Sequence, residues 1–288
     1  MIKKGIILAG GYGTRLGPLT KAVNKQLLPL YDKPLIYYPL SVLILAGIKN
    51  ILIITNKDEK SNFIKLLGDG SKLGIKITFL EQGRPKGLPD AFIIGKNFIR
   101  KDGIALILGD NFFYGQGFTN RLKTALHNNE GATIFTYIVN NPSDYGILEI
   151  DRRNKIKKIV EKPSRPKSNL AITGLYFFNN KVVHFAKKLK PSKRNELEIV
   201  DLLNIYLKNK SLQSEFMGRG SAWLDTGNAT TLFNASQYIA AIEERQGLKI
   251  ACIEEISYQN KWISKKQILK RISFYGKCDY SNYLKKII

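Results

Sequence analysis

A glycine-rich loop directly after the first apolar run is the feature that most constrains the fold of this chain. Residues 5–8 are apolar, and Gly10, Gly11 and Gly13 follow at once. A strand that leads into such a loop is typical of open α/β sheets, which bind ligands beyond the carboxyl ends of their strands. Glycines let backbone N–H groups crowd around phosphate oxygens. The loop therefore predicts a phosphate site at the end of the first strand.

Cations follow the loop closely. Thr14 and Arg15 come directly after it, and Lys25-Gln26 stands ten residues further on. The spacing excludes the two commonest phosphate loops, because there is no GxxxxGK[ST] motif and Leu16 occupies the third glycine position of a dinucleotide fingerprint. A glycine turn that merely caps a strand is the structural alternative. The adjacent Arg15 and Lys25 favour phosphate binding over that alternative.

The loop is one of a series of short motifs that run through the whole chain. The others are Leu108-Gly109-Asp110-Asn111, Tyr145-Gly146, Glu161-Lys162-Pro163, Thr173-Gly174, Glu196-Leu197-Glu198 and Trp223-Leu224-Asp225-Thr226-Gly227. In order and spacing this series resembles the sugar-1-phosphate nucleotidylyltransferases, with their GxGTRL…K signature. The resemblance is narrower still to the bacterial members that use dTTP and glucose 1-phosphate.

The resemblance implies a Rossmann-like α/β fold with three layers (α/β/α) and a mixed, mostly parallel central sheet. We expect a nucleotidyltransferase core over residues 1–247. Its nucleotide-binding half covers about 1–140 and its sugar-binding half about 141–247. The basic segment 248–288 has a less regular pattern and is expected to form a C-terminal helical appendage.

Hydrophobic periodicity supports alternating strands and helices in the first half. Strands are expected at 4–8, 50–55, 75–80, 104–108, 133–139, 146–150, 156–160 and 170–178. Helices are expected at 35–46, 60–67, 89–98, 118–127, 181–189, 198–208 and 230–246. Pro39, inside the first of these helices, is expected to kink it.

Two aspartates are candidate metal ligands. Asp110 ends an apolar run, and Asp225 follows another apolar stretch far away in the sequence. A pair of carboxylates that converges on a phosphate suits Mg²⁺, which takes one or two protein oxygens together with waters and phosphate oxygens. Each aspartate alone also fits a solvated loop or a helix cap. In the family that the chain resembles, both positions hold the metal.

The resemblance also assigns the remaining site residues. The residues expected to carry the reaction are Arg15, Lys25, Asp110, Lys162 and Asp225. Those expected to bind the nucleotide are Gly10, Gly11, Gly13, Thr14, Arg15, Lys25, Gln26, Gln82, Gly87, Leu88 and Asp110. Those expected to bind the sugar phosphate are Asn111, Tyr145, Gly146, Glu161, Lys162, Thr173 and Arg194. Trp223 fits either a wall of the sugar pocket or a core aromatic.

The chain departs from the family pattern near the expected base site. The family usually reads Gln-Pro-Ser-Pro-x-Gly-Leu-Ala-Gln-Ala, whereas residues 82–91 read Gln-Gly-Arg-Pro-Lys-Gly-Leu-Pro-Asp-Ala. Gln82, Pro85, Gly87 and Leu88 are retained. The choice between thymine and uracil is therefore less fixed by the sequence than the reaction itself.

The net charge of +23 does not identify a partner. Lys and Arg are spread along the chain instead of forming a basic arm or stripe, so we expect no nucleic-acid partner. No apolar run approaches the roughly 20 residues that span a bilayer, and we expect no membrane partner. Because the first strand begins at the N-terminus and only two cysteines occur, we expect a cytoplasmic protein.

The expected reaction is transfer of a thymidylyl group from dTTP to glucose 1-phosphate, giving dTDP-glucose and pyrophosphate, with Mg²⁺ as cofactor. The resemblance implies a homotetramer. The same chemistry with UTP or another sugar 1-phosphate is the nearest alternative. A non-catalytic regulatory relative and a basic nucleic-acid-binding protein are more remote ones.

Overall fold

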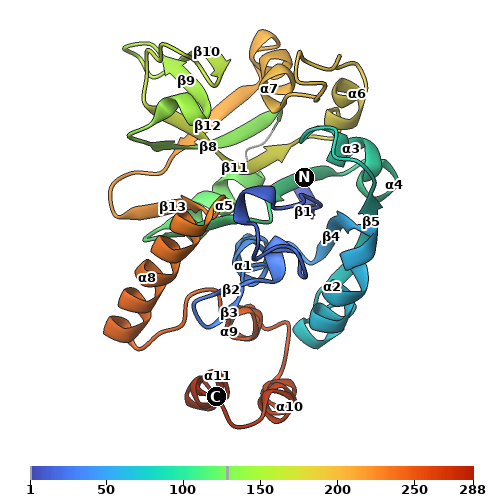
Figure 1. Cartoon of the computed structure of the whole chain (residues 1–288), viewed down its shortest axis with the longest axis vertical. Helices are drawn as coiled ribbons and strands as arrows, with labels where there is room; N and C mark the ends of the chain where they lie inside the picture. Colours follow the sequence, from blue (N-terminus) through green and yellow to red (C-terminus); the bar gives the residue numbers. More distant parts are fainter. Residues whose placement is uncertain (1, 128–129) are drawn as a thin grey trace.

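A nine-stranded sheet forms the centre of the molecule (Figure 1). The computed structural model describes residues 2–127 and 130–288. Four strands, in the order β6-β1-β4-β5, run parallel and are built from the first 108 residues. The long strand β11 lies antiparallel to β6 and joins these strands to β8, β9, β10 and β12. The sheet is thus mixed, as predicted, with one half parallel and the other largely antiparallel.

The strands of the central sheet have these bounds: β1 Ile2–Ala9, β4 Asn50–Asn56, β5 Lys76–Gln82, β6 Gly103–Leu108, β8 Ala132–Ile138, β9 Gly146–Ile150, β10 Ile156–Glu161, β11 Leu170–Phe178 and β12 Leu212–Phe216. The helices are α1 Tyr37–Leu45, α2 Lys60–Leu67, α3 Asp90–Ile94, α4 Lys96–Ile99, α5 Phe118–His127, α6 Val182–Ala186, α7 Ile199–Lys208, α8 Ala229–Gln246, α9 Ile253–Gln259, α10 Lys265–Tyr275 and α11 Asp279–Lys286.

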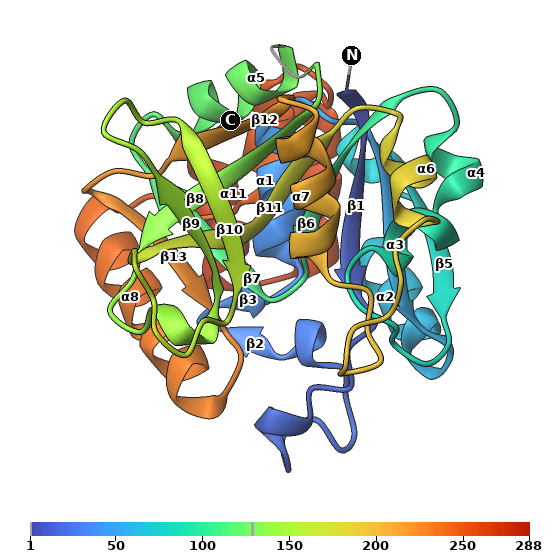
Figure 2. The ribbon, with the colours of Figure 1, turned by 90° about the horizontal axis from the view of Figure 1, so that it is seen from above.

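Helices cover both faces of the sheet, which gives the predicted three layers (Figure 2). Ile6 and Ile7 show why, since neighbouring residues of a strand point to opposite faces and both are fully buried. Ile7 packs in a core with α1, α2 and α5, and Ile6 packs in a second core with α3, α6 and α7. Parallel strands buried on both faces read as continuous apolar runs, which is the pattern of residues 5–8.

The sequence predicted most elements of the central sheet but missed a second, smaller one. Strands β7 (Asn111–Gly115) and β13 (Ser221–Asp225) form a separate antiparallel pair. A short antiparallel pair, β2 (Pro29–Leu30) and β3 (Lys33–Pro34), was also missed, as was β12. The expected helix 89–98 is interrupted at Gly95 into α3 and α4, and the expected helix 181–189 is shortened to α6.

The expectation that Pro39 kinks the first helix is wrong. Helix α1 begins at Tyr37, so Pro39 lies in its first turn. Proline has no backbone N–H, and at such a position none is needed, because the first N–H groups of a helix have no acceptor within the helix.

Helix α8 is fixed at its start by a capping box. The Asn228 side chain accepts from the backbone N–H of Thr231 at 2.9 Å, and the Thr231 hydroxyl accepts from the Asn228 N–H at 3.2 Å. Asparagine is among the best residues at this position. The helix therefore begins directly after the segment that carries Asp225.

Three helices, α9 to α11, follow α8 and share a small core of their own. The carboxylate of Glu254 is fully buried among them. It accepts hydrogen bonds from Arg271 Nε at 3.1 Å and from the hydroxyls of Tyr275 and Tyr280, each at 2.7 Å. A buried charge is tolerated only when it is paired and hydrogen-bonded in this way. Among the residues described, no helix is long and apolar enough to cross a membrane.

This cluster gives a prediction for stability. Replacing Arg271 by Met leaves the Glu254 carboxylate buried without its cation, which is expected to lower the free energy of unfolding by about 3–5 kcal/mol. Urea unfolding followed by circular dichroism measures the change. Lys270→Met, at the exposed neighbour on the same helix, is the control and is expected to shift stability by no more than about 0.5 kcal/mol. Equal unfolding midpoints for the two variants would contradict the prediction.

Candidate active site

The loops at the carboxyl ends of the parallel strands meet at one edge of the sheet. Strand β1 leads into the glycine loop 10–13, β5 into residues 83–90, and β6 into Gly109 and Asp110. Loops at this edge form the ligand crevice of open α/β sheets. The sequence motifs that follow these three strands are thereby brought together.

Asp110 and Asp225, which are far apart in sequence, are brought together by the pairing of β7 with β13. In this pair Asp225 lies opposite Asn111, the residue after Asp110. The carbonyl oxygen of Asp110 accepts from the backbone N–H and the hydroxyl of Thr226, at 3.0 and 2.9 Å. Both carboxylates line one cavity of about 700 Å³, which we call the aspartate cavity.

The electrostatics of the aspartate cavity are those of two like charges near two cations. Lys25 Nζ, on a buried side chain, donates to Asp110 Oδ2 at 2.6 Å. Burial raises the pKa of the Asp225 carboxyl, the nearby Asp110 raises it further, and Lys25 and Arg15 lower it. Burial and the neighbouring Asp225 raise the pKa of Tyr145 to about 12, so its hydroxyl stays protonated at neutral pH. The two carboxylates of this cavity are therefore suited to binding a cation.

Arg15 reaches the same cavity from the short 3₁₀ turn that follows the glycine loop. A Cβ added at Gly227, two residues beyond Asp225, would lie 3.1 Å from Arg15 Nη2, so the guanidinium packs directly against that glycine. Thr14 begins this turn, and Gly13 precedes it in a left-handed conformation at φ 61°. Arg15, predicted to face phosphates, thus lines the same cavity as both aspartates.

Amide side chains gather behind the glycine loop. A Cβ on Gly10 would lie 2.4 Å from Gln82 Oε1, so a larger residue would displace the Gln82 amide, and 3.4 Å from Asn56 Oδ1, which is an ordinary contact. Gln26 is buried, and its Oε1, like Asn56 Oδ1, has no hydrogen-bond partner among the described residues. Unpaired buried amide oxygens are rare and indicate a missing donor. Asn56 was not among the residues predicted from the sequence, where its only signal was its place at the end of a parallel strand.

Tyr145, Gly146, Glu161, Lys162 and Arg194 line a neighbouring cavity of about 280 Å³, which we call the Glu161 cavity. It shares Tyr145 and Lys162 with the aspartate cavity. Arg194 Nη2 lies 3.4 Å from a Glu161 oxygen and 2.7 Å from one of Glu198. Lys162 has a φ of 41°, an unusual backbone conformation for a side-chain-bearing residue, and such strain is concentrated at functional sites.

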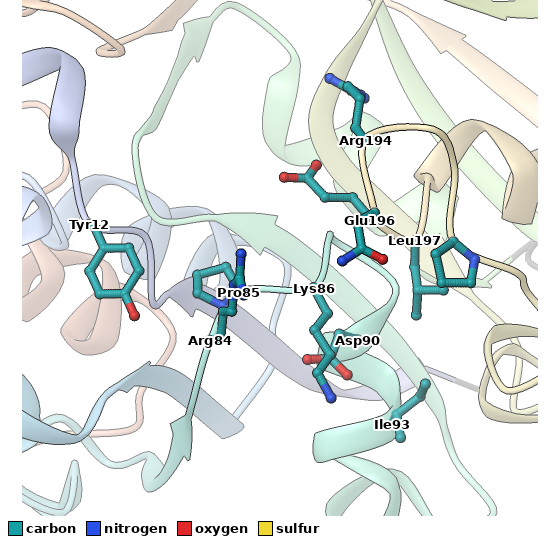
Figure 3. Close-up of a pocket in the computed structure, with 11 residues that line it drawn as sticks. Tyr12, Arg84, Pro85, Lys86, Asp90, Ile93, Arg194, Glu196 and Leu197 are labelled. Carbon is teal, nitrogen blue, oxygen red and sulfur yellow. The ribbon is translucent and has the colours of Figure 1, made fainter.

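A third cavity of about 720 Å³, the outer cavity, adjoins the Glu161 cavity through Arg194 (Figure 3). Tyr12 and Arg194 lie on opposite sides of it. The segments that form it are joined directly, since Leu197 N–H donates to the Lys86 carbonyl at 2.8 Å. Gly87 has a φ of 97°, and a Cβ there would lie 2.1 Å from the Leu197 carbonyl oxygen. The retained Gly87 therefore allows loop 83–90 to contact the loop that carries Arg194.

Not every predicted site residue presents its polar group to a cavity. Thr173 lines the aspartate cavity, but its hydroxyl donates to the Phe135 carbonyl at 3.0 Å. The Asn111 side chain bonds to Asp110, Gly174 and Trp223. Gly11 is exposed in the loop, and Leu88 lines the Glu161 cavity. No group of three or more His, Cys, Asp or Glu side chains with the geometry of a metal site occurs in residues 2–127 and 130–288.

Comparison with known proteins identifies the family. The profile of the family described as "Nucleotidyl transferase" matches residues 4–242. This chain belongs to the nucleotidyl transferase family. The glucose-1-phosphate thymidylyltransferase of Neisseria meningitidis is 51% identical over 285 residues, which is 99% of each chain. That of Xanthomonas campestris is 50% identical over 98% of this chain and 96% of its own.

Solved structures of the family agree with the fold. A putative glucose-1-phosphate thymidylyltransferase from Bacillus anthracis, in complex with a sucrose, is 38% identical with a TM-score of 0.76. The match covers 82% of this chain and 94% of that one. A UDP-glucose pyrophosphorylase complexed with UDP-glucose is 28% identical with a TM-score of 0.74, over 85% and 100% of the two chains. The chain is thus a nucleotidyltransferase, as the sequence predicted.

The Glu161 cavity yields a prediction about ionisation. Burial and the neighbouring Glu198 raise the pKa of Glu161, whereas Arg194 and Lys162 lower it. Arg194→Met removes one lowering cation, so the pKa of Glu161 is expected to rise further, as measured by NMR titration of ¹³C-labelled glutamate carboxyls. A raised carboxyl pKa costs stability as the pH rises from the ordinary value through the raised one, so this loss is expected to be larger in the variant.

Lys193→Met is the control for this prediction. Lys193 is the exposed neighbour of Arg194, and it is not among the charges that shift the pKa of Glu161. Its Glu161 titration is expected to match that of the wild-type protein. A lower Glu161 pKa in Arg194→Met would contradict the assigned electrostatics.

Proposed function

We propose that the chain transfers a thymidylyl group from dTTP to glucose 1-phosphate, giving dTDP-glucose and pyrophosphate. The observation that carries the proposal is the convergence of Asp110, Asp225, Arg15 and Lys25 at the glycine loop, next to the Glu161 cavity. The relatives with that name, which align along nearly the whole chain, support the choice of substrates.

The nucleotide would lie along the glycine loop. Backbone N–H groups of residues 10–13, with Thr14, Arg15 and Lys25, would surround the triphosphate, and the two cations would offset its charge. The unpaired oxygen of Gln26 and the amide of Gln82 suit the N–H of a pyrimidine base. Gly87 and Leu88 would border the base on the other side.

Glucose 1-phosphate would occupy the space shared by the aspartate and Glu161 cavities. Glu161, Tyr145 and Gly146 would face the hexose hydroxyls, and Lys162 and Arg194 its phosphate. The Thr173 hydroxyl, which donates to the Phe135 carbonyl, would contribute only as an acceptor. The ion pairs of Arg194 with Glu161 and Glu198 hold the guanidinium at this cavity. Arginine's planar fork matches phosphate oxygens well.

The two aspartates fit Mg²⁺. Carboxylate oxygens are the donors it prefers. Burial and, to a lesser degree, the nearby Asp110 raise the pKa of Asp225, and a bound cation would stabilise the ionised form of both carboxylates. A site with only two carboxylates leaves the remaining positions to water and phosphate oxygens. When bound, the ion would neutralise charge on the nucleotide phosphates.

The side chains would act mainly by positioning. The phosphate of glucose 1-phosphate is already a nucleophile at neutral pH, so the site needs no general base to activate it. Lys162 and Arg194 would offset repulsion between the two anionic substrates, and Arg15 would stabilise the charge that develops on the departing pyrophosphate. In-line attack on the α-phosphorus would then depend on alignment and electrostatic stabilisation.

UTP is the second candidate nucleotide, for two reasons. The structural relative named as a UDP-glucose pyrophosphorylase shares the fold over 85% of this chain. Loop 83–90 also departs from the usual family sequence at Gly83, Arg84, Pro89 and Asp90.

We further propose a homotetramer in the cytoplasm, which the family resemblance supports. Multi-angle light scattering of the purified protein gives the assembly mass directly. A mass other than four times 32.6 kDa would exclude the tetramer.

The substrate assignment is tested with a panel of nucleotides. Purified protein with Mg²⁺ and glucose 1-phosphate is assayed for pyrophosphate release with dTTP, UTP, dCTP and ATP. The highest kcat/KM is expected with dTTP. A higher kcat/KM with UTP would replace the proposed reaction by uridylyl transfer. If no nucleotide gives pyrophosphate release, both candidate reactions are refuted.

The roles of the aspartates are tested by Asp110→Asn and Asp225→Asn. Each is expected to lower kcat roughly 100-fold or more, because a charge that stabilises the reacting phosphates through Mg²⁺ is lost. Because ionised Asp225 is buried near a like charge, Asp225→Asn is expected to keep or raise the melting temperature of the metal-free protein at neutral pH. Asp58→Asn, an exposed position, is the charge-matched control. Near-normal Mg²⁺-dependent turnover in either site variant would overturn the assignment.

A further inference from the structure

Asn111 is placed at the centre of a buried hydrogen-bond network. It is the first residue of β7, and only 2% of it is exposed. Its Oδ1 accepts from Trp223 Nε1 at 2.7 Å and from the Gly174 backbone N–H at 3.1 Å. Its Nδ2 donates to Asp110 Oδ1 at 3.0 Å. One amide thus joins an indole and a neighbouring strand to a candidate metal ligand.

The two donors fix which end of the amide faces Asp110. An indole N–H and a backbone N–H are donors only, so the group between them must be the carbonyl oxygen. The NH₂ group of Asn111 is then obliged to point toward Asp110. Turning the amide by 180° would oppose N–H to N–H at two contacts and present an oxygen to the Asp110 carboxylate.

Asp110 is consequently held on both carboxylate oxygens. Asn111 donates to Oδ1, and Lys25 Nζ donates to Oδ2 at 2.6 Å. The Asp110 carbonyl oxygen is held by Thr226, the residue after Asp225. The carboxylate is therefore oriented by contacts from Asn111 and Lys25, and the backbone of Asp110 is held by Thr226.

The network also connects β13, which carries Asp225, with the start of β7, directly after Asp110. Trp223 and Asp225 are two residues apart on β13, so their side chains lie on the same face of the strand. The indole of Trp223 is 7% exposed, and its N–H donates across the pair to Asn111 on β7. The backbone of Gly174 also lies against Asn111, since a Cβ at Gly174 would be 2.4 Å from Asn111 Oδ1.

We propose that Trp223 and Asn111 are positioning residues that orient the Asp110 carboxylate for the divalent cation. This rests on the proposed function, in which Asp110 and Asp225 hold Mg²⁺. It gives Asn111 a role different from the sugar contact predicted from the sequence. It also gives Trp223 a role beyond forming a wall or filling the core.

The first test is Trp223→Phe, which removes one N–H while keeping an aromatic ring. Mn²⁺ binding is measured by EPR titration, with and without dTTP, so the readout does not depend on turnover. The Kd for Mn²⁺ is expected to rise about tenfold or more, in line with the loss of a partner that orients a metal ligand. An unchanged Kd would overturn the proposal.

Tyr137→Phe is the matched control. The Tyr137 ring contacts the Trp223 ring edge-on, and its hydroxyl donates to the Ser221 carbonyl on the same strand at 3.1 Å. The variant thus removes a hydrogen bond to β13 without interrupting the route to Asp110. It is expected to retain the wild-type Kd for Mn²⁺. A tenfold loss in this variant as well would indicate general loosening of β13 and would count against the proposal.

The second test is Asn111→Ser, which retains a polar group but is too short to join Trp223 to Asp110. If Asn111 positions Asp110, the Mg²⁺ concentration for half-maximal activity rises and the KM for glucose 1-phosphate stays within about twofold. If Asn111 instead binds the sugar, that KM rises and the Mg²⁺ dependence is unchanged, which would overturn the proposal. Turnover of the wild-type protein with dTTP tests the proposed function separately. Failure of the proposed function can therefore be distinguished from failure of the positioning role.

Discussion

The pairing of β7 with β13 is the interaction on which the candidate site depends. It places Asp225 opposite Asn111 and brings two carboxylates, separated by more than a hundred residues, to one cavity. Burying two like charges together is unfavourable, and the raised pKa of Asp225 is the sign of that cost. Lys25 and Arg15 offset part of this unfavourable energy. The part that is not offset favours the binding of a cation.

The parallel half of the sheet was predictable because its physical signal is local. Strands buried on both faces have an apolar centre, and β1, β4 and β6 read that way in the sequence. The pair β7–β13 was missed for the opposite reason. Asn111–Gly115 follows β6 with only two residues between, and its pairing partner lies over a hundred residues away, so no periodicity within the chain reveals it.

In the candidate site, too, local sequence predicted some features, and contacts between distant segments decide the others. The motifs and the resemblance that they carry identified Arg15, Lys25, Asp110 and Asp225. The structure brings Arg15, Asp110 and Asp225 to one cavity, and Lys25 is bonded to Asp110. The direction in which an amide or indole points cannot be read from a motif, because it depends on contacts between distant segments. Asn111 is the clearest case, since Gly174 and Trp223 decide the orientation of its side chain.

The contact between loop 83–90 and the Arg194 loop has a consequence for protein engineering. The Lys86 carbonyl bonds to the Leu197 N–H, and Gly87 fits directly against the Leu197 backbone. The two loops therefore form one continuous surface, even though one borders the expected base and the other the expected sugar phosphate. If one of these loops is replaced by that of a relative, the other loop must be replaced with it, so that the contact between them is kept. If these loops border the base and the sugar phosphate as expected, a substitution in one is expected to shift the other as well, whereas β7 and β13 pair in a sheet of their own.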